Sequence, residues 1–205
     1  MPALPELLSR FPGLQLEVDL ENRQVDLVAE GFDIGIRGGI IRDSSLIARR
    51  VCALPLVLVA SPEYLMRHGV PRDLDALHKH RCVTVRFPSG SIPSWQFRVE
   101  DALLEQTPSA QLAVTEPEAA VDLAVAGAGV TQAGLHHVLP YLRSGRLKLL
   151  LSGIHAPGER EIVLHYPHRQ YLAPRVRVTV DYLLQYFAAA TDLHLRVSEV
   201  QQYAA

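Results

Sequence analysis

The sequence has little cysteine, and its two cysteines lie far apart. Cys52 and Cys82 form no CxxC pair in a chain of 205 residues. A disulfide framework or a cysteine-based zinc site needs a different pattern, so neither is predicted. We interpret the two residues as buried, reduced thiols.

The sequence also lacks an excess of charge of one sign and any long apolar run. Its 20 Lys and Arg face 22 Asp and Glu, which leaves a formal net charge of −2 and no basic patch for a nucleic acid. No apolar run approaches the roughly 20 residues of a membrane span. The start, MPALPELLSRFPG, has no signal-peptide pattern. We therefore expect a cytoplasmic region with no nucleic-acid or membrane partner.

Motifs of catalysis and cofactor binding are missing as well. The sequence contains no GxSxG, no P-loop and no GxGxxG after a predicted strand. Its nine histidines include the adjacent pair His136 and His137, but none has the i, i+4 partner and nearby carboxylate of a zinc site. We predict no catalytic residue, no metal and no cofactor.

What the sequence does have is a steady alternation of short apolar strands and helices. With 48% hydrophobic residues, it has the composition of a globular chain with a substantial core. The alternation predicts an α/β fold with mostly parallel sheets. The expected strands are 14–20, 32–36, 54–60, 81–85, 97–99, 112–114, 130–131, 147–151 and 162–166. The expected helices are 5–11, 22–29, 62–69, 73–78, 115–127, 135–142 and one that begins at Pro174.

One candidate binding segment is Arg37, Gly38 and Gly39, directly after the predicted strand 32–36. Ligands of open α/β sheets bind beyond the carboxyl ends of strands. Glycine allows close approach of the backbone, and arginine can bind a carboxylate with two hydrogen bonds. The alternative is a glycine turn in which the arginine pairs with Asp33 or Asp43.

Two further segments lie at equivalent positions. Thr84, Val85 and Arg86 end a strand, and Thr115 with Glu116 opens a helix whose free amides favour an anion, although Glu116 competes for them. The alternatives are an exposed loop with a solvated arginine and an ordinary helix cap.

Four stretches in order resemble the effector-binding half of LysR-type transcriptional regulators: VDLVAEGFDIGIRGGIIRDSSLIARRV, ASPEYLMRHGVPRDLDALHKHRCV, AVAGAGVTQAGLHHVLPYLRSGRL and LHYPHRQYLAPRVRVTVDYLLQYF. The resemblance implies two Rossmann-like lobes joined by two crossing strands, similar to type 2 periplasmic binding proteins, with a small effector in the cleft between them. Lobe I would be 1–61 plus 162–190, and lobe II 62–161. The implied hinge residues are Ala60, Ser61, Val163 and Leu164. The implied effector-binding residues are Arg37, Gly38, Gly39, Thr84, Val85, Arg86, Thr115, Glu116 and Gln132. The resemblance also implies a homodimer.

The sequence departs from the family pattern at its start. The family's winged helix-turn-helix, the first strand of lobe I and a Ser/Thr loop would all precede Pro5. The tail 191–205 offers a replacement, because Leu193, Leu195 and Val197 alternate as in a strand and would bring Ser198 to the cleft. The alternative is a frayed tail or a helix extension. Other functions remain open: a free solute-binding protein of a transport system, an enzyme on the same fold, or a regulator remnant that binds no ligand.

Overall fold

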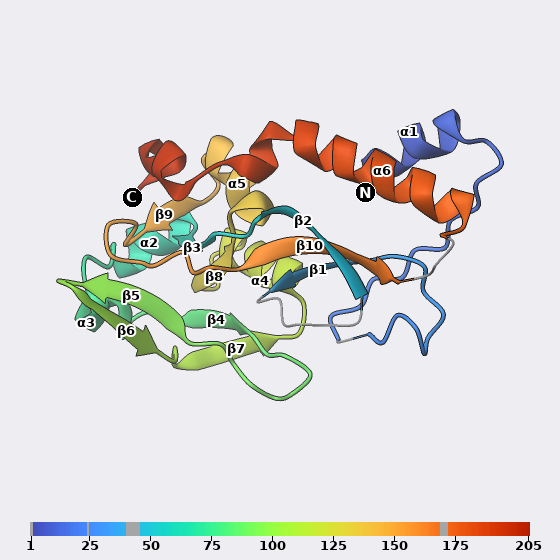
Figure 1. The fold of residues 1–205 in the computed structure, drawn as a ribbon. Helices are drawn as coiled ribbons and strands as arrows, with labels where there is room; N and C mark the ends of the chain where they lie inside the picture. Colours follow the sequence, from blue (N-terminus) through green and yellow to red (C-terminus); the bar gives the residue numbers. More distant parts are fainter. Residues whose placement is uncertain (1, 24, 40–45, 169–171) are drawn as a thin grey trace. The chain divides into compact units, whose positions relative to one another are not determined.

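The computed structural model describes residues 2–23, 25–39, 46–168 and 172–205. The chain divides into two compact units (Figure 1). Unit 1 consists of Met1–Ala53 and Arg160–His194, and unit 2 consists of Leu54–Glu159 and Leu195–Ala205. The chain therefore passes between the units at 53–54, 159–160 and 194–195. The predicted hinge residues lie inside the units rather than at these points: Ala60, Ser61, Val163 and Leu164.

Unit 1 contains a three-stranded antiparallel sheet and two main helices. The strand order is β1 (Gly35–Gly39), β10 (Glu161–Pro167) and β2 (Leu46–Ala53). The helices are α1 (Ala3–Arg10), α6 (Pro174–Ala189) and the 3₁₀ helix η1 (Thr191–His194). Because β10 lies between β1 and β2 and runs antiparallel to both, the prediction of mostly parallel strands is wrong here. The sequence reading also missed β2.

The core of unit 1 forms where α1 and α6 cover this sheet. Residues of α6 at the spacing i, i+4, i+7 form an apolar stripe on its buried side: Val176, Val180 and Leu183 are buried in one cluster with Leu164 and Leu7. Burial on this scale stabilises by about 2 kcal/mol per large aliphatic side chain. The hydroxyl of Tyr182 donates to the carbonyl of Ala3 at 3.1 Å and ties α6 to α1.

Residues 14–20 form no strand, contrary to the prediction. Their alternation is partly real, because Leu14 and Leu16 pack against the core of unit 1. Val18 and Leu20 are exposed, and no described strand pairs with this segment. An alternating pattern predicts which side chains face a core, but a strand also needs a hydrogen-bonding neighbour.

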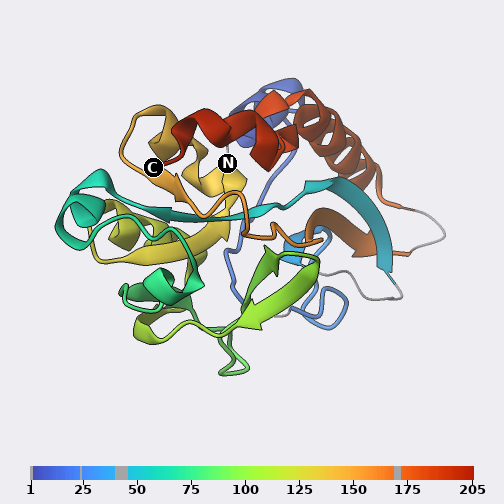
Figure 2. The same cartoon turned by 90° about the vertical axis from the view of Figure 1, so that its left-hand side faces the viewer.

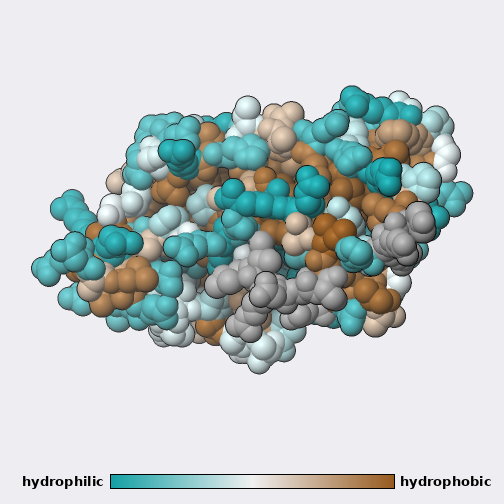
Figure 3. All heavy atoms as spheres, in the orientation of Figure 1, coloured by the Kyte–Doolittle hydropathy of each residue, from teal (hydrophilic) through white to brown (hydrophobic). Residues whose placement is uncertain are grey.

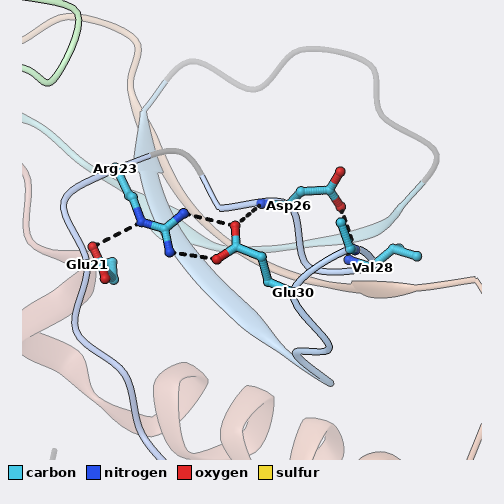
Figure 4. Close-up of polar contacts among 6 residues, drawn as sticks. Glu21, Arg23, Asp26, Val28 and Glu30 are labelled. Carbon is cyan, nitrogen blue, oxygen red and sulfur yellow. Dashed lines mark hydrogen bonds and ion pairs between the residues drawn. The ribbon is translucent and has the colours of Figure 1, made fainter.

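The predicted helix 22–29 is replaced by a turn held by side chains (Figure 4). A carboxylate oxygen of Asp26 accepts from the amides of Val28 at 3.0 Å and Ala29 at 3.1 Å, which competes with a helical backbone. Arg23 donates to both carboxylate oxygens of Glu30, at 2.9 and 2.6 Å. These hydrogen bonds lower the pKa of the Glu30 carboxyl.

Unit 2 is built on a five-stranded sheet in the order β7-β4-β8-β3-β9. These strands are β7 (Ala110–Val114), β4 (Cys82–Val85), β8 (Val130–Gly134), β3 (Leu56–Ala60) and β9 (Lys148–Leu150). β7, β4 and β8 are parallel, whereas β3 runs antiparallel to β8 and β9. The helices are α2 (Pro62–His68), α3 (Leu74–Leu77), α4 (Pro117–Val125), α5 (Leu135–Arg143) and the 3₁₀ helix η2 (Val197–Tyr203).

Both faces of this sheet are covered, which agrees with the nearly all-apolar sequence of 54–60. Val57 and Val59 belong to one buried cluster and Leu58 and Ala60 to another. Successive side chains of a strand point to opposite faces, so the two clusters lie on the two faces. The first cluster includes residues of α4, α5 and η2. The second includes residues of α2 and α3 and of a β-hairpin formed by residues 95–106. Figure 2 shows the C-terminal segment near α5 and the hairpin on the other side of the sheet.

That hairpin, β5 (Trp95–Val99) with β6 (Ala102–Gln106), is an addition to the predicted order of strands. The sequence indicated β5 but missed β6. Phe97 and Trp95 point into the core, whereas Leu103 and Leu104 are exposed, and Figure 3 shows hydrophobic surface in the region of the hairpin. β6 has no consistent alternation of burial, which explains why its pattern was missed.

The predicted N-terminal caps of the helices agree with the structure only in part. Ser61 caps α2 by accepting from the amide of Tyr64 at 3.3 Å, and Asp73, which was expected as the first residue of a helix, caps α3 by accepting from the amide of Ala76 at 2.7 Å. The prediction that Thr115 caps α4 is wrong, because Glu116 is the N-cap residue and makes no side-chain cap bond. None of the described helices is long and apolar enough to cross a membrane.

The C-terminal tail contradicts the predicted strand 193–197. Leu193 lies in η1, Val197 begins η2, and neither belongs to a sheet. From Leu195 onward the tail belongs to unit 2, where Val200 is 2% exposed in the core beside α5 and β9. The amide of Ala205 donates to the carbonyl of Leu149 at 3.0 Å. The tail is thus a docked segment of unit 2 and not the missing strand of lobe I.

Candidate functional site

The candidate site is the carboxyl edge of the parallel strands of unit 2. Val85 at the end of β4 pairs with Val114 at the end of β7, and the amide of Arg86 donates to the carbonyl of Val114 at 2.8 Å. This pairing brings Thr84, Val85 and Arg86 beside Thr115 and Glu116, as the sequence predicted for one edge of a sheet. Arg86, Thr115 and Glu116 are exposed there.

Thr84 and Gln132 lie on the same face of the sheet. Val83 pairs with Thr131 in the parallel β4–β8 ladder, so the residues that follow, Thr84 and Gln132, share the opposite face. Gln132 also pairs with Leu58, whose side chain belongs to the cluster of the hairpin face. Two polar side chains therefore lie next to each other on an otherwise apolar face.

Thr84 is the unusual member of this pair. It is 3% exposed, and its hydroxyl oxygen has no hydrogen-bond partner among the described residues. By contrast, Thr131, which precedes Gln132 on β8, donates from its hydroxyl to the carbonyl of Val83 at 2.9 Å. A buried polar group without a partner costs about 1–3 kcal/mol, and such groups are uncommon in folded proteins.

His155 completes a polar cluster that the sequence did not reveal. The side-chain amide nitrogen of Gln132 lies 2.8 Å from Nε2 of His155. The imidazole is 8% exposed and meets the ring of Phe97 edge-on, with centroids 5.5 Å apart. Burial lowers the pKa of His155 to about 4, so the ring is neutral at pH 7 and accepts this hydrogen bond. His155 lies in a loop 23 residues from Gln132, and no spacing rule connects them.

The start of α4 adds backbone amides and negative charge at this edge. α4 begins at Pro117, and its N-cap residue Glu116 makes no side-chain cap bond to the amides of the first turn. Glu116 and Glu118 compete there with any anion, and Glu118 lies 3.8 Å from Nε2 of His137 on α5. A positive group at this edge is supplied by Arg86.

The other predicted residues lie in different places. In unit 1, Arg37 and Gly38 are exposed on β1, and Gly39 has a φ of +151°, which favours glycine. Asp33, one proposed partner of Arg37, lies 3.8 Å from Arg175 instead, and Asp43 is outside the described residues. Burial first, and the charge of Arg37 second, lower the pKa of His165.

Ser198 does not join either set of residues. It is exposed on η2 in unit 2, because the strand that was expected to carry it does not form. Within the described residues no group of three His, Cys, Asp or Glu is arranged to hold a metal ion. The polar groups at the carboxyl edge are suited to hydrogen bonding and to pairing with one negative charge.

Comparison with known proteins places this chain and its fold in a family. The LysR substrate binding domain matches residues 1–188. The HTH-type transcriptional regulator DmlR of Escherichia coli (strain K12) is 32% identical over 187 residues, which are 91% of this chain and 60% of DmlR. The uncharacterized HTH-type transcriptional regulator YcaN of the same strain is 31% identical over 186 residues, which are 89% of this chain and 60% of YcaN.

Solved structures agree with these matches. CrgA, a LysR-type transcriptional regulator from Neisseria meningitidis, superimposes with a TM-score of 0.83 at 25% identity, covering 91% of this chain and 63% of CrgA. The regulatory domain of AphB in Vibrio vulnificus gives a TM-score of 0.75 at 27% identity and covers 90% of both chains.

The chain belongs to the LysR substrate binding domain family. Its fold is that of the regulatory domains of LysR-type transcriptional regulators, which supports an effector-sensing role in transcription control. The resemblance stated from the four sequence stretches is thereby confirmed. The chain spans about 60% of the length of the curated relatives that it matches.

Proposed function

We propose that this chain senses a small organic acid on behalf of a LysR-type regulator and that the acid binds at the carboxyl edge of unit 2. The observation that carries the proposal is the buried hydroxyl of Thr84 beside Gln132, for which the described part of the chain supplies no hydrogen-bond partner. A ligand oxygen would give Thr84 the hydrogen bond that it lacks, and the guanidinium of Arg86 would pair with a carboxylate.

The sensing role involves binding rather than bond breaking. A ligand that prefers one arrangement of the domain shifts its population, and a homodimer would pass that shift to the rest of the regulator in the cytoplasm. Membership of a family of transcriptional regulators supports this part of the proposal. Arg37, Gly38 and Gly39 in unit 1 stay predicted effector contacts, and an Arg37→Ala variant tests that prediction by itself.

The test is thermal unfolding in the presence of a library of small carboxylates and aromatic acids. A bound ligand raises the midpoint temperature by mass action. At a ligand concentration one hundred times the dissociation constant, the free energy of unfolding increases by about 2.7 kcal/mol. The variants are Thr84→Val, which removes the unpaired hydroxyl at nearly constant shape, and Arg86→Gln. The matched control is Arg72→Gln, another exposed arginine of unit 2.

The expected result is that one class of acids stabilises the parent and Arg72→Gln. Thr84→Val and Arg86→Gln should need at least a tenfold higher concentration of the same acid for equal stabilisation. Stabilisation that is equal in all four proteins would place the ligand elsewhere. If no acid stabilises the parent, the alternative of a regulator remnant without a ligand is favoured.

A further inference from the structure

A cavity lies at the amino end of strand β4, the end opposite the candidate site. It has a volume of about 100 Å³, and Trp95, Cys82 and Leu77 form much of its apolar wall. β4 begins at Cys82 and ends at Val85, so the cavity and the carboxyl edge occupy opposite ends of one strand (Figure 1). All of the lining residues belong to unit 2.

The polar part of the wall is preorganised. His78, just after α3, lies with Nε2 2.9 Å from the side-chain carbonyl oxygen of Gln106 at the end of β6, so Nε2 carries the proton and donates. Ser109 lines the cavity before β7. The cavity thus combines an apolar wall with an exposed donor–acceptor pair, and an apolar lining with a few polar groups is the usual composition of a small-molecule site.

The lining carries no fixed charge. It contains no Asp, Glu, Lys or Arg. His80 is buried, and burial lowers its pKa, while burial raises the pKa of the Cys82 thiol to about 11. Both groups are therefore neutral near pH 7. An ionic ligand would lose hydration here without gaining a partner of opposite charge.

The volume limits the size of the ligand. An engineered apolar cavity of roughly 150 Å³ holds benzene. A cavity of about 100 Å³ that is open on one side holds most of one small ring and leaves a polar substituent near its mouth. The wall of Trp95 suits a flat ring, since aromatic pairs add about 0.5–1.5 kcal/mol beyond burial.

We propose that this cavity is a second ligand site, which takes a small, uncharged ring compound carrying one hydrogen-bonding group. The ring contacts Trp95, and the polar group meets the His78–Gln106 pair. This site is separate from the carboxyl edge, where Arg86 selects a negative charge, and it does not depend on the function proposed above.

The experiment uses the intact chain labelled with ¹⁵N. Trp95 is the only tryptophan, so the single indole N–H signal comes from the wall of this cavity. Phenol is titrated as the neutral probe and benzoate as the charged probe of similar size. Ser109→Phe fills the mouth of the cavity, and Ser89→Phe places the same side chain at another exposed serine of unit 2. Thr84→Val reports on the carboxyl edge.

Phenol is expected to move the indole signal with saturation, and benzoate is expected to leave it in place. Ser109→Phe should weaken the binding of phenol at least tenfold, whereas Ser89→Phe and Thr84→Val should bind it as the parent does. Absence of a saturable shift in the parent overturns the proposal, as does equal binding by Ser109→Phe. Saturable binding of benzoate at Trp95 overturns the assignment of an uncharged ligand.

Discussion

Protonation of His155 is expected to destabilise unit 2. The side-chain amide of Gln132 donates to Nε2 of this buried imidazole at 2.8 Å. A proton on Nε2 would place two donors opposite each other in an apolar setting, and no carboxylate is recorded as a partner of this ring among the described residues. The folded protein therefore resists protonation more strongly than the unfolded chain does.

The direction and the size of this loss of stability follow from the pKa values of His155 in the unfolded and folded states. The pKa of His155 falls from 6.5 to about 4 on folding. Between these values the unfolded state binds the proton and the folded state does not, so stability is lost as pH falls from 6.5 towards 4. One pKa unit corresponds to about 1.4 kcal/mol, so the loss is about 2 kcal/mol at pH 5 and about 3 kcal/mol once both states are protonated.

The assay is urea unfolding at pH 7 and pH 5 of the parent and of His155→Asn. Asparagine can keep a hydrogen bond to Gln132 but does not titrate. Burial also lowers the pKa of His136 to about 4, and this contribution is common to both proteins and cancels. The parent should lose about 2 kcal/mol more than the variant between the two pH values. Equal losses, or an NMR titration midpoint of His155 near 6.5, would refute the reasoning.

Three further changes have expected outcomes in unit 2. Gly129→Ala should destabilise by about 3 kcal/mol in urea unfolding, because the added Cβ would lie 2.3 Å from the carbonyl oxygen of Arg81, and a neutral result would show that the backbone yields there. Val200→Ala should cost about 2 kcal/mol by lost burial and a residual cavity, and calorimetry should show a lower midpoint; an unchanged midpoint would mean that the tail does not complete the core. Thr84→Val should raise the unfolding free energy by about 1 kcal/mol in the absence of ligand, since it removes an unpaired hydroxyl, and a lower value would show that Thr84 has a partner.

The sequence predicted well the elements that carry their own signals. α2 has a serine cap, proline at its first position and Gly69 at its end, and it forms where expected. The all-apolar run of β3 indicated a strand buried on both faces, and the stripe of α6 indicated its buried side. Local chemistry decides these features, so one sequence is enough to find them.

Other elements depend on partners that no local pattern names. Residues 14–20 alternate like a strand but lack a neighbour to pair with. The turn before Glu30 depends on competition between Asp26 and a helical backbone. The tail alternates over 193–197 but forms 3₁₀ helices instead of a strand, and its side chains divide between the units: Leu193 lies in unit 1, whereas Leu195 and Val197 pack against the core of unit 2.

The candidate site divides in the same way. Thr84, Arg86 and Glu116 were found because strand ends and helix starts mark them in the sequence. His155 was missed because only the long-range bridge between Phe97 and His155 brings it to Gln132. The absence of a hydrogen bond at Thr84 is a property of the packed structure and has no counterpart in the sequence.

The docked tail also sets the order in which unit 2 can be completed during synthesis. Residues 54–159 of unit 2 leave the ribosome before the second half of unit 1, and residues 195–205 follow that half. At roughly 5–20 residues per second, adding 160–205 takes about 2–9 s. Throughout that interval the hydrophobic face that Val200 covers has no cover on the nascent chain. Residues 195–205 thus close a core that was begun seconds earlier, and a ribosome that stops short of them leaves that face open to chaperones.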